Sequence, residues 1–448
     1  MKEVTLHKRT HYFEVVPVAL SLSALFFANS ASAQTLPKAF VASAGQSRCA
    51  SSEGYSASFQ GRRTFIWRPE WLNQVKGDAS ASAQERRRGL ITQALRALDQ
   101  TPLSVVDKTK SALSGDKHDY YSMGPYWWPD PSKPNGEPYI RRDGVVNPER
   151  NGEGFDADRL SRLSDNVSNL ALAHFYTGDL RYAQKAAQLI RVWFLDADTK
   201  MNPNLSYAQA IPGVTAGRAE GIIDGHRFIP VIESIGLLAP SAVLSQTEMR
   251  DLERWFGDLA LWMATSPTGQ EERAKSNNHG IFYDLLIAQF SLFARQPQIA
   301  TQVISSFPET RMSRQFSADG SLPEELTRTR SWHYSHWTLG AIGKLAGLGE
   351  CVGLDLWRTN LPDGRGLARS LSFMTKYVAR ENTWTFPETA FQPGGNLNSA
   401  REIAMETFWI AGWGFSDRSY SALGSFYSSQ VTGSDVKFWL SSFQSNAQ

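Results

Sequence analysis

The sequence is poor in cysteine and carries almost no net charge. Only two of its 448 residues are cysteines, Cys49 and Cys351, and no cluster of cysteine and histidine has the spacing of a zinc site. Two thiols this far apart can pair in an oxidising compartment, but their spacing does not decide whether they do. The formal net charge is +2, so no general basic field indicates nucleic-acid binding. An acidic ligand would have to be held by local arginines and lysines.

Long apolar runs are absent except near the N-terminus. Lys8 and Arg9 precede an apolar run over 15–27, and a triplet of small residues ends at Ala33. This three-part pattern predicts a secretory signal peptide over 1–33, cleaved after Ala33, and a periplasmic or secreted protein. The run is too short for a comfortable membrane span, so no membrane anchor is expected.

The remaining chain divides into an irregular part and a helical part. Residues 34–80 contain scattered serine, glycine and alanine, and an irregular N-terminal segment is expected there. Residues 113–157 are rich in glycine, proline and aromatics, which predicts a long ordered loop because dense aromatics argue against disorder. Alternation with period two is confined to short pieces near 383–387. Helical periodicity covers 82–98, 160–176, 179–194, 219–237, 245–264, 280–294, 323–348, 366–379 and 400–411.

Short turns join many of these predicted helices. Gly178 ends one helix and Asp179 can cap the next, which is the pattern of an αα-hairpin. Sequential helices with short turns pack as antiparallel neighbours. The sequence therefore predicts an all-α domain over 81–448, an (α/α) toroid (an incomplete α/α barrel) with long aromatic loops lining a cleft. A helical solenoid is the alternative, but no repeat of fixed period is visible.

Aromatic and arginine residues alternate in the long loop. Tyr126, Trp127, Trp128 and Arg141 lie there, in a chain that has 14 tryptophans and 14 tyrosines. Flat apolar rings can contact the C–H faces of sugars, and loops often carry binding residues. We interpret this segment as the wall of a groove for an anionic sugar chain. The alternative is a loop that is merely fastened to the body by its tryptophans.

A second segment, 201–213, links two predicted helices and is rich in amide side chains. Asn204, Gln209 and, shortly after, Arg218 are candidate substrate-binding residues because amides and guanidinium groups bond to hydroxyls or carboxylates. Asn-Pro pairs are also ordinary turn formers, so each residue alone is a weak signal.

A third segment places Asn277, Asn278 and His279 directly before an apolar helix. Two amides and an imidazole at a helix start form a candidate site. The alternative is an N-cap without any other role, since asparagine is a good cap.

The fourth segment begins a long predicted helix. Ser321 and Glu324 match a capping box, which would give Glu324 a structural role. In one continuous helix Arg330 and Tyr334 share a face, whereas Arg328 lies about a third of a turn away. His333 adds a polar ring where a buried helix face would prefer leucine, which favours a site.

Together these residues suit β-elimination on a uronate polymer. The C5 proton is hard to remove until the adjacent carboxylate is neutralised. Asn278 and His279 can bond to that carboxylate and an arginine can add charge, so neither a metal nor a cofactor is required. Tyr334 can then remove the proton and protonate the leaving oxygen, provided that a neighbouring Arg328 or Arg330 lowers its pKa towards neutrality. In β-1,4-linked mannuronate and glucuronate both groups lie on one side of the ring, so one tyrosine can serve a syn elimination.

Several of these motifs, in this order, resemble the alginate lyase superfamily. They are Tyr120 through Asp143, 170–173 with 176–179, Trp193-Phe194, Met201 through Gly213, Asn277 through His279, and the arginine-containing helix ending in His333-Tyr334. The similarity spans about 110–350 and is strongest to lyases of glucuronan and mannuronate-rich alginate. It implies an (α/α) toroid, an Asn278–His279 pair that neutralises the carboxylate, and Tyr334 as base and acid. The family pattern favours Arg328 as the catalytic arginine, whereas helix geometry favours Arg330. Arg330, Asn277 and His333 are also candidate substrate-binding residues.

Two other functions compete with this hypothesis. A glycoside hydrolase on the same fold would need two carboxylates across the cleft, and no convincing pair is visible in the sequence. A non-catalytic polyuronate-binding protein would not need the phenol of Tyr334. The sequence does not choose between glucuronan and alginate or between endo and exo action. A monomer is expected.

Overall fold

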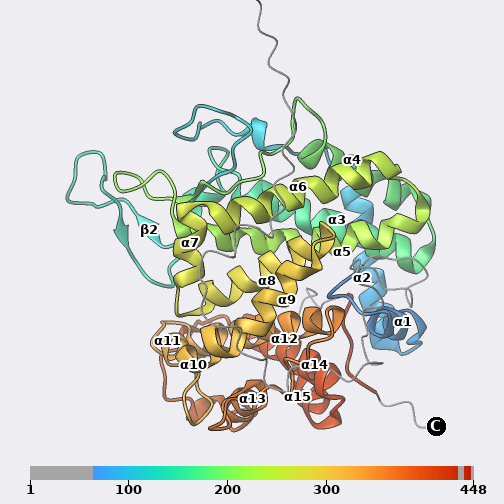
Figure 1. Ribbon diagram of the computed structural model, residues 1–448, viewed down its shortest axis with the longest axis vertical. Helices are drawn as coiled ribbons and strands as arrows, with labels where there is room; N and C mark the ends of the chain where they lie inside the picture. Colours follow the sequence, from blue (N-terminus) through green and yellow to red (C-terminus); the bar gives the residue numbers. More distant parts are fainter. Residues whose placement is uncertain (1–63, 432–437, 445–448) are drawn as a thin grey trace, which may run out of the picture. The chain divides into compact units, whose positions relative to one another are not determined.

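The computed structural model describes residues 64–431 and 438–444, all within one compact unit of the chain, Thr35–Gln448 (Figure 1). The predicted signal peptide over 1–33 and Cys49 lie outside the described residues. Cys351 is disulfide-bonded. Among the described residues, no helix is both long enough and apolar enough to cross a membrane.

Helices make up most of the regular structure in these residues, which confirms the all-α prediction. They are α1 (Pro69–Gly77), α2 (Ala81–Leu98), α3 (Ala157–Thr177), α4 (Leu180–Phe194), α5 (Phe228–Leu238), α6 (Gln246–Thr265), α7 (Pro267–Ala274), α8 (Asn278–Phe293), α9 (Pro297–Phe307), α10 (Ser313–Gln315), α11 (Pro323–Leu326), α12 (Ser331–Cys351), α13 (Leu367–Thr375), α14 (Leu397–Phe415) and α15 (Arg418–Ser428). A 3-10 helix, Ala219–Arg227, leads directly into α5.

The turn between α3 and α4 lies where the sequence predicts it. Gly178 closes α3 with φ 75°, and Asp179 accepts a hydrogen bond from the backbone N–H of Arg181 at the start of α4. Glycine adopts this left-handed conformation without steric cost, so the chain reverses in a short turn. The α3–α4 hairpin is therefore confirmed.

The helices form an inner and an outer layer. Side chains from α2, α3, α5, α8, α12 and α14 line one central hollow, while α4, α6, α9 and α15 pack behind them. Helix α8 is buried along nearly its whole length, from Gly280 to Phe293, because it is covered on both sides. This arrangement confirms the (α/α) toroid.

Aromatic side chains fill the space between the two layers. Phe194 of α4, Phe228 of α5 and Phe256 of α6 are all buried, and their ring centroids lie 5.5–6.0 Å apart. Burying such large apolar rings stabilises the packed layers by removing much of their surface from water.

Some expectations about the elements are wrong. Helix α1 lies within the interval 34–80 that was expected to be irregular; Pro69 begins it, and its buried face includes Trp71 and Leu72. Helices α7, α9 and α15 were not predicted. The single helix expected over 323–348 is interrupted at 327–330, between α11 and α12.

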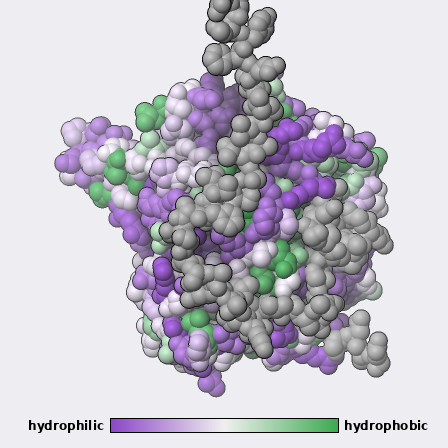
Figure 2. All heavy atoms as spheres, viewed as in Figure 1, coloured by the Kyte–Doolittle hydropathy of each residue, from purple (hydrophilic) through white to green (hydrophobic). Residues whose placement is uncertain are grey.

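Four short strands position the loops, and none of them lies near 383–387. They are β1 (Tyr121–Met123), β2 (Trp127–Trp128), β3 (Ile140–Arg141) and β4 (Tyr207–Ala210). Strand β1 pairs in parallel with β4, and β2 pairs antiparallel with β3. The segment around β2 projects from the helices in Figure 1, and Figure 2 shows both hydrophilic and hydrophobic side chains on this projection.

Candidate active site

A cleft of about 370 Å³ lies where the projecting loop meets the starts of α8 and α12. The structure brings together in its wall most of the residues predicted from the sequence. These are Tyr126, Trp127, Arg141, Gln209, Arg218, Asn277, Asn278, His279, Arg328 and Tyr334. Segments far apart in the sequence therefore converge on one site.

Tyr334 lies in the first turn of α12 with its ring largely buried. Its hydroxyl oxygen is 2.6 Å from that of Tyr126, and the guanidinium carbon of Arg328 lies 3.9 Å from the ring centroid. Burial, followed by the neighbouring Tyr126, raises the pKa of Tyr334 well above its usual range, although Arg328 opposes this. The expectation that an arginine brings the phenol close to neutral pKa is therefore wrong for the resting site, because desolvation outweighs the cation.

Arg328, and not Arg330, is the arginine beside this phenol. The argument for Arg330 assumed a continuous helix, but α12 begins only at Ser331. Arg330 turns away, with its guanidinium 3.3 Å from Nδ1 of His333, and its backbone bridges to Glu388. Arg330 and His333 are not among the residues that line the cleft.

The start of α8 holds an asparagine and a histidine at the cleft through two buried carboxylates. Asn277 caps the helix by accepting a hydrogen bond from the N–H of His279, as its alternative role predicted. Glu325 accepts two hydrogen bonds from Asn278, from its backbone N–H at 2.6 Å and from its amide nitrogen at 2.8 Å. Nδ1 of His279 lies 2.7 Å from Oε1 of Glu272, whose side chain is 0% exposed. The ring is thus fixed through Nδ1, which leaves Nε2 for other contacts.

Burial raises the pKa of both carboxyls, Glu272 and Glu325. The bonds from His279 and Asn278 act in the opposite direction, since they favour the charged forms.

Close packing fixes the path of the chain at this helix start. Arg311 is buried, makes a bidentate ion pair with Asp284 at 2.7 and 2.9 Å, and donates to the carbonyl of Lys275. A Cβ at Gly280 would clash with that carbonyl and with the Arg311 guanidinium. Only glycine fits here, so the position of His279 depends on Gly280.

The amide-rich segment contributes a held arginine. Gln209 has a positive φ of 51°, its amide nitrogen donates to buried Asp224 at 3.0 Å, and its oxygen accepts from Arg218 at 2.6 Å. A backbone kept in this strained region indicates that surrounding contacts overdetermine it. Both Gln209 and Arg218 line the cleft, whereas Asn204 does not: its amide nitrogen lies 3.2 Å from Asp119 and its oxygen closes a turn.

Asp143 fastens the projecting loop over α12. Its carboxylate accepts from Arg141 at 2.7 Å, from Arg328 at 3.2 Å and from the Thr329 hydroxyl at 3.0 Å. Trp127 lines the cleft, but Trp128 does not; the indole N–H of Trp128 donates to the carbonyl of Val145. The loop is therefore both a wall of the cleft and fastened to the body.

The predicted capping box at Ser321 and Glu324 is wrong. Helix α11 is preceded by Leu322 without a side-chain cap, and the Ser321 hydroxyl instead donates to Asp319. Glu324 is free of that role and lines the cleft.

Sequence reasoning missed the buried acids and one cation of the site. Lys275 lines the cleft and its ammonium group lies 2.9 Å from Glu220, which also lines it. Glu272 lies on α7, whose start was marked by a capping serine, Ser266, followed by a proline. That signal was available in the sequence. Within residues 64–431 and 438–444, no group of three or more His, Cys, Asp or Glu side chains is arranged to hold a metal ion.

Comparisons with known proteins show the family of this chain. A family model described as alginate lyase matches residues 104–384. An alginate lyase from Bacteroides ovatus, known from its crystal structure, is 38% identical with a TM-score of 0.77, and the match covers 82% of this chain and 96% of that one. Alginate lyase A1-III from Sphingomonas species A1 is 16% identical over 70% of this chain and 85% of its own, with a TM-score of 0.44, too low to support an argument. No curated protein matched the sequence. The chain belongs to the alginate lyase family and is a polysaccharide lyase.

Proposed function

We propose that this enzyme cleaves a β-1,4-linked polyuronate, mannuronate-rich alginate or glucuronan, by metal-independent syn β-elimination. The observation that carries the proposal is the placement of Tyr334, whose hydroxyl meets Tyr126 and whose ring lies under Arg328, in the same cleft as Asn278 and His279. The similarity to the Bacteroides ovatus alginate lyase supports a substrate of the alginate type.

The charge of the cleft suits an anionic chain. Arg141, Arg218, Lys275 and Arg328 line it, and opposing them are two carboxylates, Glu220 and Glu324. Glu220 is already paired with Lys275 at 2.9 Å and lies 3.6 Å from Arg218. Arg141 and Arg328 share one carboxylate, that of Asp143, so their other N–H donors can hold a substrate carboxylate and stabilise the charge that develops next to C5.

In the proposed step, Tyr334 takes the proton from C5 while Asn278, His279 and Arg328 hold the carboxylate. The electrons of the broken C5–H bond form the C4–C5 double bond, and the bond between C4 and the glycosidic oxygen breaks. That oxygen stays with the upstream sugar and receives the proton from Tyr334. The products are a new reducing end and a chain that begins with an unsaturated uronate.

The raised pKa of Tyr334 determines how this step depends on pH. The resting phenol is protonated, so its proton must leave before C5 can be deprotonated, and the hydroxyl of Tyr126 is the adjacent group that can exchange it. Below the pKa, the phenolate fraction grows about tenfold per pH unit. We therefore expect kcat/KM on the polymer to rise with pH into the alkaline range.

The test is a substrate screen combined with one substitution. Purified enzyme is incubated with polymannuronate, polyguluronate and glucuronan, and ultraviolet absorption reports the C4–C5 double bond. Absorption should rise on polymannuronate or glucuronan, and Tyr334→Phe should abolish it while polymer binding persists. Tyr420→Phe, on α15, is the matched control that retains activity. Saccharide release without absorption, or unchanged turnover in Tyr334→Phe, would contradict the proposal.

We also propose that the protein is exported, with a signal peptide over 1–33. The basic residues, apolar run and small-residue triplet of the sequence support this. The mature protein from the native host should begin at Gln34 by mass spectrometry, and a chain that retains its first residues would contradict it.

A further inference from the structure

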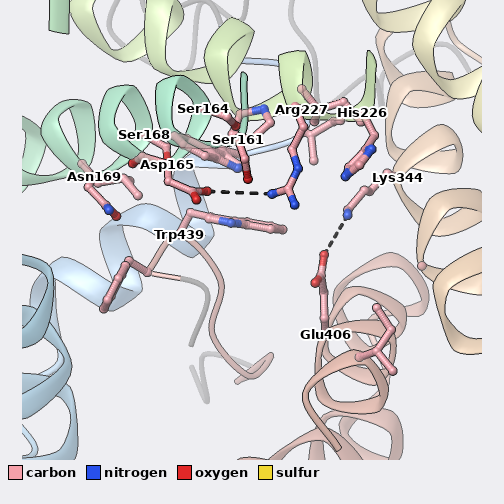
Figure 3. Close-up of a pocket in the computed structure, with 18 of the residues that line it drawn as sticks. Ser161, Ser164, Asp165, Ser168, Asn169, His226, Arg227, Lys344, Glu406 and Trp439 are labelled. Carbon is pink, nitrogen blue, oxygen red and sulfur yellow. Dashed lines mark hydrogen bonds and ion pairs between the residues drawn. The ribbon is translucent and has the colours of Figure 1, made fainter. Parts of the chain in front are cut away.

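A second, larger cavity lies behind the cleft, in the central hollow of the toroid (Figure 3). Its volume is about 520 Å³, and Trp337 of α12 lines both the cavity and the cleft. The ring of Trp337 packs against Phe282 and His226, with centroids 4.2 and 6.0 Å away, so these rings separate the two spaces. The cavity is therefore a neighbour of the active site and not part of it.

The cavity contains polar groups whose bonding capacity is not used within the described residues. Among the described residues the Arg227 guanidinium, whose side chain is 42% exposed, makes no hydrogen bond, and Asp165 lies 3.9 Å away, beyond hydrogen-bond distance. The hydroxyl of Ser164 is buried, with the residue 1% exposed, and has no partner. Nδ1 of His226 is 2.7 Å from the carbonyl of Ile223, so Nε2 is left as an acceptor. The buried hydroxyl of Ser164 is costly to leave unpaired unless a ligand or water bonds to it, whereas the part-exposed guanidinium of Arg227 can bond to whatever enters the cavity.

A second cation and an aromatic platform complete the cavity. The ammonium group of Lys344 lies 2.7 Å from Glu406 and keeps further N–H donors. Figure 3 shows Trp439 beneath Arg227, with Lys344 and His226 to the right of the guanidinium. The indole of Trp439 is supported from behind by Trp67, at a centroid distance of 5.9 Å and 19° between the planes. A rigid indole with hydroxyl, carboxylate and cationic groups around it suits a pyranose ring.

We infer that this cavity is a second carbohydrate site, which binds a short uronate saccharide of the kind released by the enzyme. The carboxylate of the sugar bonds to Arg227, its hydroxyls bond to Ser164 and Asp165, and one ring face packs on Trp439. This inference rests on the proposed function for the identity of the ligand. Lys344 is paired with Glu406, so the preference for a uronate over a neutral sugar comes from Arg227, because a charged hydrogen bond is stronger than a neutral one.

Calorimetric titration with a saturated mannuronate disaccharide tests the inference. The protein carries Tyr334→Phe so that it does not turn the ligand over. We expect two binding sites per chain, and Arg227→Met should weaken one of them at least tenfold, the loss of a charged hydrogen bond, without changing the other. Arg254→Met removes an exposed arginine of α6 and should keep both sites. A neutral disaccharide, mannobiose, should not bind in the cavity, so its titration should lack the site that Arg227→Met weakens.

A second variant protects the test against misfolding. Ser161→Trp fills the cavity from α3 without changing any charge, and it should remove the same site while thermal unfolding stays cooperative. A single site that is insensitive to both variants, or equal binding of mannobiose, would overturn the inference and indicate a cavity filled by water. The absorption assay on polymer is separate, so loss of the second site and loss of lyase activity are distinguishable.

Discussion

Replacing Glu272 by glutamine should slow the chemical step more than it weakens substrate binding. Oε1 of Glu272 is 2.7 Å from Nδ1 of His279, and the glutamate side chain is 0% exposed while that of His279 is 16% exposed. Glutamine keeps the volume and can accept the same hydrogen bond, so the change removes mainly the negative charge behind the imidazole. In the proposed step that charge polarises the imidazole as it bonds to the substrate carboxylate, on which negative charge grows.

The expected size of the effect follows from the strength of a charged hydrogen bond. Such a bond contributes about 1.5–3 kcal/mol, which corresponds to a fall in kcat of roughly 10- to 150-fold. The second oxygen of Glu272 has no partner, so the new amide would also be buried without an acceptor. KM should change little, because the cationic residues that line the cleft remain in place.

The assay is the initial rate of ultraviolet absorption on polymannuronate over a range of pH, with thermal unfolding measured in parallel. Glu309→Gln, an exposed glutamate, is the matched control. A kcat within twofold of the wild type in Glu272→Gln, with cooperative unfolding, would refute the positioning role. A loss of kcat that is accompanied by an equal loss of folded protein would refute it as well, because the carboxylate would then be structural only.

Three further predictions, one of them with a paired control, concern the arginine of the site, the packing at the start of α8 and a buried histidine of α12. Arg328→Lys should lower kcat at least tenfold because lysine lacks the flat guanidinium that covers the Tyr334 ring. Arg330→Lys should leave kcat nearly unchanged. A large loss in Arg330→Lys with little loss in Arg328→Lys would show that Arg330 is the arginine of the site. Gly280→Ala should lower both kcat and the melting temperature, because its Cβ would push against a backbone carbonyl and shift the start of α8; full activity would show that this packing yields easily. His336 is fully buried with both ring nitrogens unpartnered, and burial lowers its pKa to about 3. In the unfolded chain His336 takes up a proton below the ordinary histidine pKa of about 6.5, whereas in the folded chain it stays neutral until about pH 3. The free energy of unfolding therefore falls as the pH drops from about 6.5 towards 3. The difference in free energy of unfolding between His336→Leu and the wild type should therefore shift in favour of the variant by about 2 kcal/mol when the pH falls from 7.5 to 5. Denaturant unfolding at both pH values measures this difference, and a difference that does not change with pH would contradict the prediction.

Much of the helical frame could be predicted from local patterns. The αα-hairpin at Gly178 and Asp179 is an example, since a left-handed glycine and a capping carboxylate act within a few residues of each other. Helix α7 could have been predicted by the same reasoning from its capping serine and proline.

The choice of arginine could not be made from local geometry. A continuous helix would place Arg330 beside Tyr334, but the chain at 327–330 is held by distant segments. The N–H of Ser331 donates to the carbonyl of Pro387, and the N–H of His333 donates to Glu388. Contacts across more than 50 residues thus decide where α12 begins.

The sequence by itself determined the helical class and the aromatic loop, and it predicted Asn278, His279 and Tyr334 as candidate site residues, because periodicity and side-chain chemistry are local properties. The tertiary structure alone decided which groups meet. It brought Tyr126 to Tyr334, placed Arg328 over the ring, and buried Glu272 and Glu325 behind the amide and imidazole. It also reversed the expected shift in the pKa of the phenol. Desolvation depends on everything packed around a group, and no local pattern of residues reports that.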